Sequence, residues 1–152
     1  MPALRFNHME LTLPPGTLAR DRESIIAFYG EVFGFDAIDV PLFDTSGLLL
    51  RTDTDTSQFL LLMEQDKHLQ SPGYDHLGFL YESRAEVDDR LALCKQWQAK
   101  DDRVRIKEYE DLVIPPTTTH AFYVQFLLPI WFDIQVVEYE PGTAPPRRWV
   151  YQ

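Results

Sequence analysis

The chain has 152 residues, the length of a single domain, and its 45% apolar and 25% charged residues are ordinary for a globular protein. Its net charge of −10 argues against the basic face that nucleic acids and anionic membranes require, so we expect neither as a partner. The single cysteine cannot form an internal disulfide. The N-terminus carries no apolar signal segment, and we expect a cytoplasmic protein.

The first half of the chain predicts a strand, a helix and three more strands. The first strand covers residues 6–13 and stops at the turn Pro14-Pro15-Gly16. Apolar residues then recur with helical spacing up to Gly34, a residue type that ends helices, and Asp21 is the expected N-cap. Short strands with turn residues between them follow over residues 35–40, 48–52 and 58–64.

The second half repeats this order. A strand over residues 74–81 is followed by Ser83 and Glu86, which have the spacing of a capping box at a helix start. Cys94 falls on the apolar stripe of this helix and is expected in the core. Strands are then expected over residues 104–108, 120–126 and 131–139, and an irregular tail over residues 140–152.

The repeated order places a histidine at the same position in each half. Module one, at about residues 5–65, has His8 early on its first strand, and module two, at about residues 74–139, has His76 early on its own. Such a repeat indicates one domain, residues 1–152, built from a duplicated module. The closing strands of the two modules align Leu61 with Gln135.

Two stretches of the sequence carry a family signature. They are Phe28-Tyr29-Gly30-Glu31-Val32-Phe33-Gly34-Phe35 and Asp75-His76-Leu77-Gly78-Phe79. They resemble, respectively, the end of the first helix and the start of the second module in the vicinal oxygen chelate superfamily. This superfamily includes glyoxalase I, extradiol dioxygenases and bleomycin-resistance proteins. The resemblance implies an α+β fold in which two paired βαβββ modules form a curved mixed sheet around a cavity.

The resemblance also implies a divalent metal ion in that cavity, such as Fe, Zn, Ni or Mn. Carried over one by one, the metal ligands are His8, His76 and Gln135, while another ligand position holds Leu61, which cannot bind a metal. Gln135 stands where the family often has a glutamate. Its amide oxygen is uncharged and accepts no proton, so it would bind a metal less tightly and could not act as a general base.

Further residues are expected to line the cavity and contact a substrate. Asp133 shares a strand face with Gln135, and Gln125 stands where extradiol enzymes have a tyrosine. The aromatic residues near the end of module two suit an apolar or aromatic small molecule. The expected substrate-binding residues are Leu61, His120, Tyr123, Gln125 and Asp133.

The sequence leaves three functions open. The first is a metal-dependent lyase, isomerase or dioxygenase, in which the metal acts as a Lewis acid on a small molecule with adjacent oxygens. The second is a metal-free protein that binds or sequesters a small molecule, as bleomycin-resistance proteins do. The third is a subunit with a vestigial site.

We also expect a homodimer. The resemblance implies one, and the high aromatic content leaves apolar surface that a second copy can cover. The tail residues Arg147, Arg148 and Trp149 either close over the cavity or dock on a partner chain.

Overall fold

The chain divides into two units that follow the predicted modules. The first unit covers residues 1–72 together with 127–129, and the second covers residues 73–126 together with 130–152. The tail residues Arg147, Arg148 and Trp149 lie outside the described residues. The structure, a computed structural model, describes residues 4–42, 45–53, 55 and 57–146.

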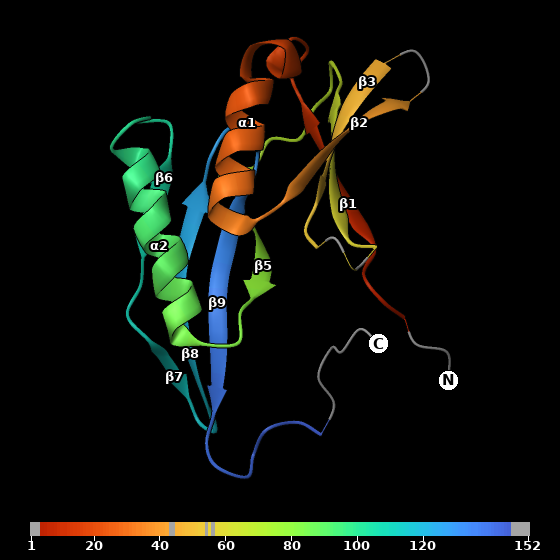
Figure 1. The fold of residues 1–152 in the computed structure, drawn as a ribbon. Coiled ribbons are helices and arrows are strands. Elements are labelled where there is room, and N and C mark those ends of the chain that lie inside the picture. The colour runs from red at the N-terminus through yellow and green to blue at the C-terminus, as the bar shows by residue number, and fades with distance from the viewer. Residues whose placement is uncertain (1–3, 43–44, 54, 56, 147–152) are drawn as a thin grey trace. The chain divides into compact units, whose positions relative to one another are not determined.

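The first unit has the order βαβββ (Figure 1). Strand β1 runs parallel to β4, while β3 pairs antiparallel with both β4 and β2, so the sheet order is β1-β4-β3-β2. Helix α1 packs on one face of this sheet. The elements are β1 (His8–Leu13), α1 (Thr17–Phe33), β2 (Asp36–Leu42), β3 (Thr45–Arg51) and β4 (Phe59–Glu64).

Helix α1 starts one turn before the predicted N-cap, so the assignment of Asp21 as N-cap was wrong. The helix begins at Thr17, directly after Gly16, whose φ of 86° lies in the left-handed region that glycine adopts readily. Asp21 is buried within the helix. The first turn is capped instead by a distant side chain, because Glu64 Oε1 accepts a hydrogen bond of 2.6 Å from the backbone N–H of Leu18.

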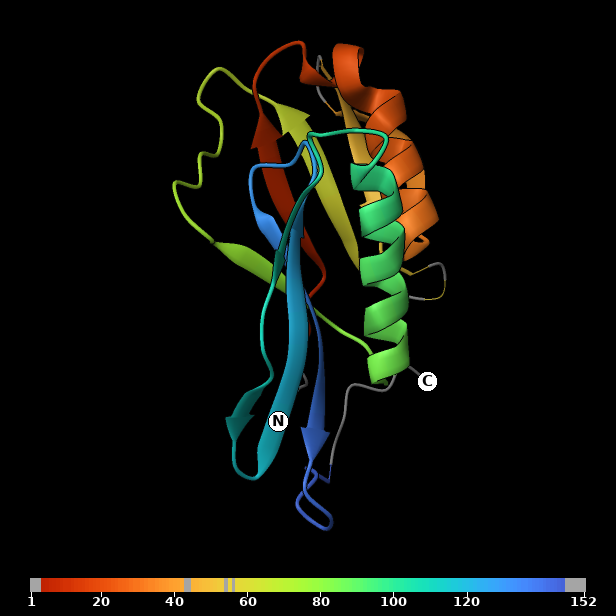
Figure 2. The ribbon, with the colours of Figure 1, turned by 90° about the vertical axis from the view of Figure 1, so that its left-hand side faces the viewer.

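The second unit repeats the βαβββ order and adds a short strand (Figure 2). Its sheet order is β5-β9-β8-β6, and the added strand β7 pairs with β8. Strands β5 and β9 are parallel and the other pairs are antiparallel. The elements are β5 (His76–Leu80), α2 (Arg84–Gln98), β6 (Arg105–Glu108), β7 (Leu112–Ile114), β8 (Thr117–Gln125) and β9 (Trp131–Tyr139).

Helix α2 begins as its sequence predicted. Ser83 is the N-cap, and its hydroxyl oxygen accepts a hydrogen bond from the backbone N–H of Glu86. The carboxylate of Glu86 in turn accepts hydrogen bonds from the Ser83 hydroxyl and the backbone N–H of Glu82. Cys94 is fully buried, as expected for a core residue, and burial raises the pKa of its thiol to about 12.

The apolar side chains that α2 covers alternate along the two long strands of the second sheet. Successive strand residues point to opposite faces, so one face can be apolar while the other carries function. Neither helix in the part of the chain that the structure describes is long and apolar enough to cross a membrane. The α+β class and the repeated βαβββ order are confirmed. The buried residues facing α2 are Phe122, Val124, Phe132, Ile134 and Val136.

Candidate binding face of the second sheet

The face of the second sheet opposite α2 collects ring and charged side chains from every long strand. Because Tyr123 pairs with both Asp133 and Lys107, these three residues point to the same side. Gly78 continues the row as the partner of Asp133 on β5. We call this surface the aromatic face. Its residues are Tyr74, His76, Arg105, Lys107, Tyr109, Tyr123, Gln125, Trp131, Asp133 and Gln135.

Five rings of the aromatic face form a continuous cluster. Tyr123 lies at its centre, with ring centroids 4.7 Å from His76 and 4.8 Å from Tyr109. Tyr74 extends the cluster, with its centroid 5.2 Å from Trp131 and 6.5 Å from Tyr123. Tyr74 and Tyr109 are 48% and 42% exposed, so the cluster is open to a ligand rather than sealed in a core.

Two basic side chains lie over these rings. The guanidinium carbon of Arg105 is 4.7 Å from the centroid of Trp131, and its Nη1 donates a 2.9 Å hydrogen bond to Gln125 Oε1. Lys107 Nζ is 3.8 Å from the centroid of Tyr74 and 5.2 Å from that of Tyr109. Desolvation lowers the pKa of Lys107, but hydrogen bonding to the two tyrosines outweighs it, so the pKa is raised and the ammonium stays charged.

Asp133 is a buried carboxylic acid beside the ring cluster. It is only 8% exposed, and its Oδ1 has no hydrogen-bond partner among the described residues. Burial raises the pKa of Asp133, and the nearby His76 offsets this only in part. A buried acid with one oxygen left without a hydrogen bond is costly for the fold, which favours a functional role for Asp133.

His76 is oriented by the backbone. Its Nδ1 lies 2.9 Å from the carbonyl oxygen of Tyr74, so Nδ1 donates that hydrogen bond. The other ring nitrogen, Nε2, then lies 3.8 Å from Asp133 Oδ2, beyond hydrogen-bond distance. Gly78 has no side chain to fill the space beside this pair. A Cβ built there would contact only Gln135 Nε2, at 3.4 Å.

Five of the residues expected at the site are therefore brought together on one face. These are His76, Tyr123, Gln125, Asp133 and Gln135. Sequence reasoning missed the two cations and two of the tyrosines. A signal existed for Arg105 and Lys107, because their i, i+2 spacing in a strand puts both on the same face.

His120 is not part of the aromatic face. It pairs with Val136, whose side chain faces α2, so His120 points to the helix side of the sheet. There its Nε2 is 2.8 Å from Asp88 Oδ1 and its Nδ1 is 2.8 Å from Asp111 Oδ1. The hydrogen bond to Asp88 is the main reason that the pKa of His120 is raised. The structure thus makes His120 an ion-pairing residue instead of the expected substrate contact.

The remaining expected residues, His8 and Leu61, belong to the first unit. The ring of His8 stacks on Phe59 with centroids 4.8 Å apart. In β-sheet register His8 pairs with Phe59, and His76 pairs with Trp131. Leu61 lies two residues after Phe59, and Asp133 lies two residues after Trp131, so Leu61 is the structural equivalent of Asp133. The predicted equivalence of Leu61 with Gln135 was therefore wrong by two residues.

The donor atoms of the second unit do not by themselves fit a tightly bound divalent metal. They comprise one imidazole, one carboxyl whose pKa is raised, and the neutral amide of Gln135. The described residues contain no group of three or more His, Cys, Asp or Glu side chains placed to hold a metal. The predicted metal site also includes His8 of the first unit, and metal binding by this chain remains a prediction.

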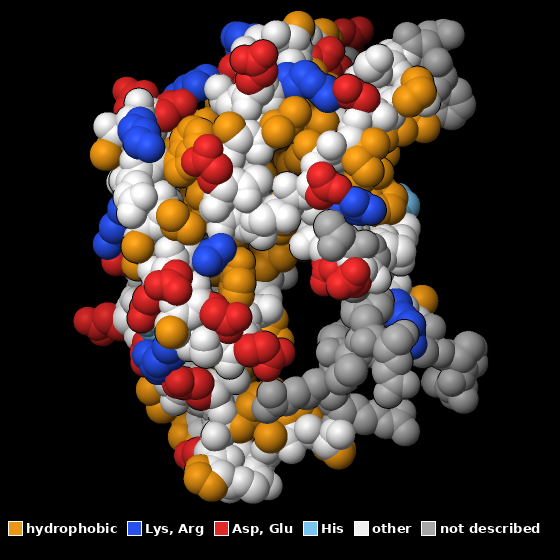
Figure 3. All heavy atoms as spheres, in the orientation of Figure 1, with side chains coloured by type: hydrophobic (Ala, Val, Ile, Leu, Met, Phe, Trp, Pro, Cys, Tyr) orange, Lys and Arg blue, Asp and Glu red, His pale blue; other side chains and the backbone are white. Residues whose placement is uncertain are grey.

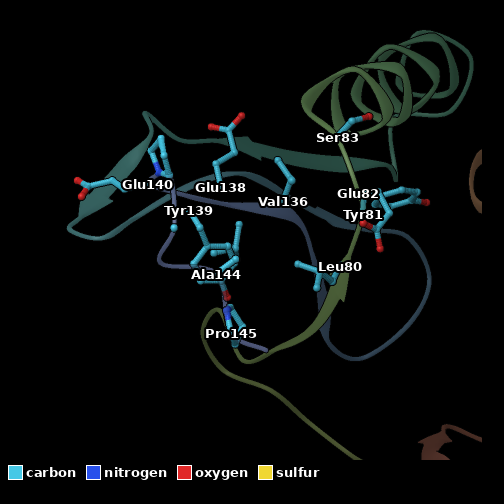
Figure 4. A pocket seen from close by; sticks show the side chains of 13 residues that line it. Leu80, Tyr81, Glu82, Ser83, Val136, Glu138, Tyr139, Glu140, Ala144 and Pro145 are labelled. Carbon is cyan, nitrogen blue, oxygen red and sulfur yellow. The ribbon is translucent and has the colours of Figure 1, made fainter. Parts of the chain in front are cut away.

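A hollow of about 570 Å³ lies at the opposite end of β9 from Trp131. Leu80 of β5 and Tyr139 of β9 border it together with Ala144 and Pro145, and three glutamates also line it, Glu82, Glu138 and Glu140 (Figure 4). Leu80 pairs with Gln135, so the hollow begins where the aromatic face ends along the strands.

No family model matches the chain, and no curated protein matches it in sequence. Solved structures do match. Fosfomycin resistance protein FosX from Listeria monocytogenes is 19% identical, with a TM-score of 0.62 and coverage of 88% of this chain and 91% of that chain. Lactoylglutathione lyase from Agrobacterium tumefaciens is 16% identical, with a TM-score of 0.56 and coverage of 90% and 96%.

A third match is the glyoxylase/bleomycin resistance protein/dioxygenase domain from Frankia sp. EAN1pec. It is 18% identical, with a TM-score of 0.58 and coverage of 93% of this chain and 96% of that chain. At these identities the likeness shows that the fold is shared.

Proposed function

We propose that this chain, which has the fold of the vicinal oxygen chelate superfamily, is a protein that binds an aromatic small molecule on its aromatic face. The observation that carries the proposal is the cluster of five rings around Tyr123, of which Tyr74 and Tyr109 are 48% and 42% exposed. Each well-placed aromatic pair contributes about 0.5–1.5 kcal/mol beyond the area it buries. Small-molecule sites combine aromatic side chains with polar groups that fix the orientation of the ligand, and this face has both kinds.

Binding without a metal is the form that the residues support best. Leu61 cannot ligate a metal, and Gln135 supplies an uncharged oxygen. Arg105, Lys107 and Asp133 instead provide polar recognition that needs no metal. Fosfomycin resistance and bleomycin resistance are named among the structural matches, which supports a role in which a small molecule is recognised.

The test uses 2-naphthol, a neutral aromatic probe, and isothermal titration calorimetry. We expect binding to the native protein and weaker binding to Tyr74→Ala and Tyr109→Ala. Both residues are half exposed, so the fold tolerates their loss. The matched control is Phe6→Ala, which removes a 78% exposed ring from the first unit. Equal loss in the control, or no binding at all, would contradict the proposal.

A metal-dependent enzyme is the second candidate. The observation in its favour is the equivalent register of His8 and His76, each opposite the aromatic residue that opens the last strand of its module. Elemental analysis of freshly purified protein separates the two candidates. A divalent metal near one equivalent, lost in both His8→Ala and His76→Ala, supports the enzyme.

A further inference from the structure

We infer that the ligand of the aromatic face is an anionic aromatic compound, an aryl carboxylate that also carries a hydroxyl group. This inference rests on the proposed function and adds the chemistry of the ligand. Three observations carry it. Two cations have no acidic partner among the described residues, these cations already cover the neighbouring ring faces, and a buried acid lies at the other end of the same row of residues.

Six basic residues in the described part of the chain pair with a carboxylate, whereas the two cations of the aromatic face do not. Neither Arg105 nor Lys107 forms a salt bridge with a described Asp or Glu. Over α2, by contrast, acidic and basic side chains are interspersed (Figure 3). In a protein of net charge −10, two unpaired cations two residues apart on β6 mark a local site for an anion. Basic residues that do pair with a carboxylate are Arg20, Arg22, Arg51, Arg84, Lys95 and Arg103.

A cationic ligand fits this surface less well. Lys107 already occupies the ring faces of Tyr74 and Tyr109, and Arg105 occupies that of Trp131. A ligand ammonium would have to displace one protein cation and tolerate the other. A carboxylate gains two charge-assisted partners without displacing either.

Asp133 lies at the end of this row opposite the cations, and its carboxylate can accept a hydrogen bond from a donor on the ligand. Lys107, Tyr123 and Asp133 are consecutive partners across β6, β8 and β9, so two strand spacings of about 4.8 Å separate the first from the last. One aromatic ring over Tyr123 spans this distance, with its carboxylate toward the cations. A hydroxyl on the far side of the ring then donates to the carboxylate of Asp133, which is 8% exposed and whose buried Oδ1 accepts no hydrogen bond from the described residues.

The experiment compares three probes, 4-hydroxybenzoate, benzoate and phenol, by isothermal titration calorimetry at low salt. We expect 4-hydroxybenzoate to bind tightest, because benzoate lacks the hydroxyl and phenol lacks the carboxylate. Lys107→Gln and Arg105→Gln should each weaken 4-hydroxybenzoate and benzoate about tenfold, and change phenol little. The control is Lys100→Gln, which removes the same charge from an exposed position at the end of α2.

The outcomes separate this inference from the proposed function. If 2-naphthol binds but benzoate binds no better than phenol, the anionic ligand is rejected and the aromatic site stands. The same holds if Lys107→Gln tightens binding, or if tetramethylammonium competes with the probes. If no aromatic probe binds, the proposed function itself fails.

Discussion

Asp133 Oδ2 lies 3.8 Å from Nε2 of His76, and the second carboxyl oxygen of Asp133 has no partner among the described residues. This pair stands at the edge of the ring cluster, beside the empty position of Gly78. An acid left without a full set of hydrogen bonds lowers the stability of the fold. A buried acid that lowers stability agrees with the ligand contact proposed above.

Asp133→Asn should stabilise the protein at neutral pH by roughly 1–3 kcal/mol, because the neutral amide costs less than a charged carboxylate to bury without a full set of hydrogen bonds. Burial raises the folded-state pKa of Asp133 above its ordinary value of 3.8. The contribution of Asp133 to stability is therefore fully present below about pH 3.8 and is lost as the pH rises through the folded-state pKa. Urea unfolding at pH 7 and pH 3.5 should show a gain only at pH 7. A less stable variant at pH 7 would mean that the carboxylate has a strong partner.

Glu64→Ala should lower the free energy of unfolding by about 1 kcal/mol, as expected for the loss of a helix cap. The carboxylate accepts the N–H of Leu18 in the first turn of α1, where a negative charge is also favourable. Glu64→Gln keeps an acceptor and loses only the charge, so it should cost less. Urea unfolding of both variants tests this. Equal stability of Glu64→Ala and the native protein would show that α1 needs no cap from β4.

The sequence predicted the elements whose signals are local. The capping box of Ser83 and Glu86 lies within one turn of α2, and Gly34 ends α1 with a φ of 73°, as expected. The start of α1 could not be predicted this way, because its cap, Glu64, lies 46 residues away along the chain. Strand β7 was missed because it has only three residues and depends on pairing with β8.

Only part of the site could be predicted, because the sequence alone does not show which residues pair across neighbouring strands. His120 and Tyr123 are three residues apart on one strand, so their opposite faces follow from strand alternation alone. Tyr74 lies two residues before His76 in the predicted strand, so alternation would have placed it on this face, whereas Tyr109 follows the end of β6 and joins the site through its ring contact with Tyr123. Asp133 was included, but its position opposite Gly78 and Tyr123 required the strand pairing.

His120→Gln should destabilise the protein more at pH 5 than at pH 9. His120 joins Asp88 of α2 to Asp111, and these hydrogen bonds raise its folded-state pKa above 6.5. The stability that the charged ring contributes is fully present below about pH 6.5 and is lost as the pH rises through the folded-state pKa. Asp88 is largely exposed, so we expect a loss of only about 2–4 °C in Tm at pH 5. Thermal melts that give the same difference at both pH values would contradict an ionic role.

Gly78→Ala should separate binding from stability. A Cβ at Gly78 contacts only Gln135 Nε2, at 3.4 Å, so the strand accommodates it, and replacing glycine restricts the unfolded chain by about 0.4–1 kcal/mol. The methyl group nevertheless fills the space beside Asp133 and Gln135, where the hydroxyl end of 4-hydroxybenzoate is expected. We expect unchanged or higher stability together with several-fold weaker binding. The control is Gly73→Ala, because a Cβ at Gly73 has no atom within 4 Å and leaves the aromatic face unchanged. If calorimetry shows the same affinity in both variants, the ligand does not reach the space beside Asp133.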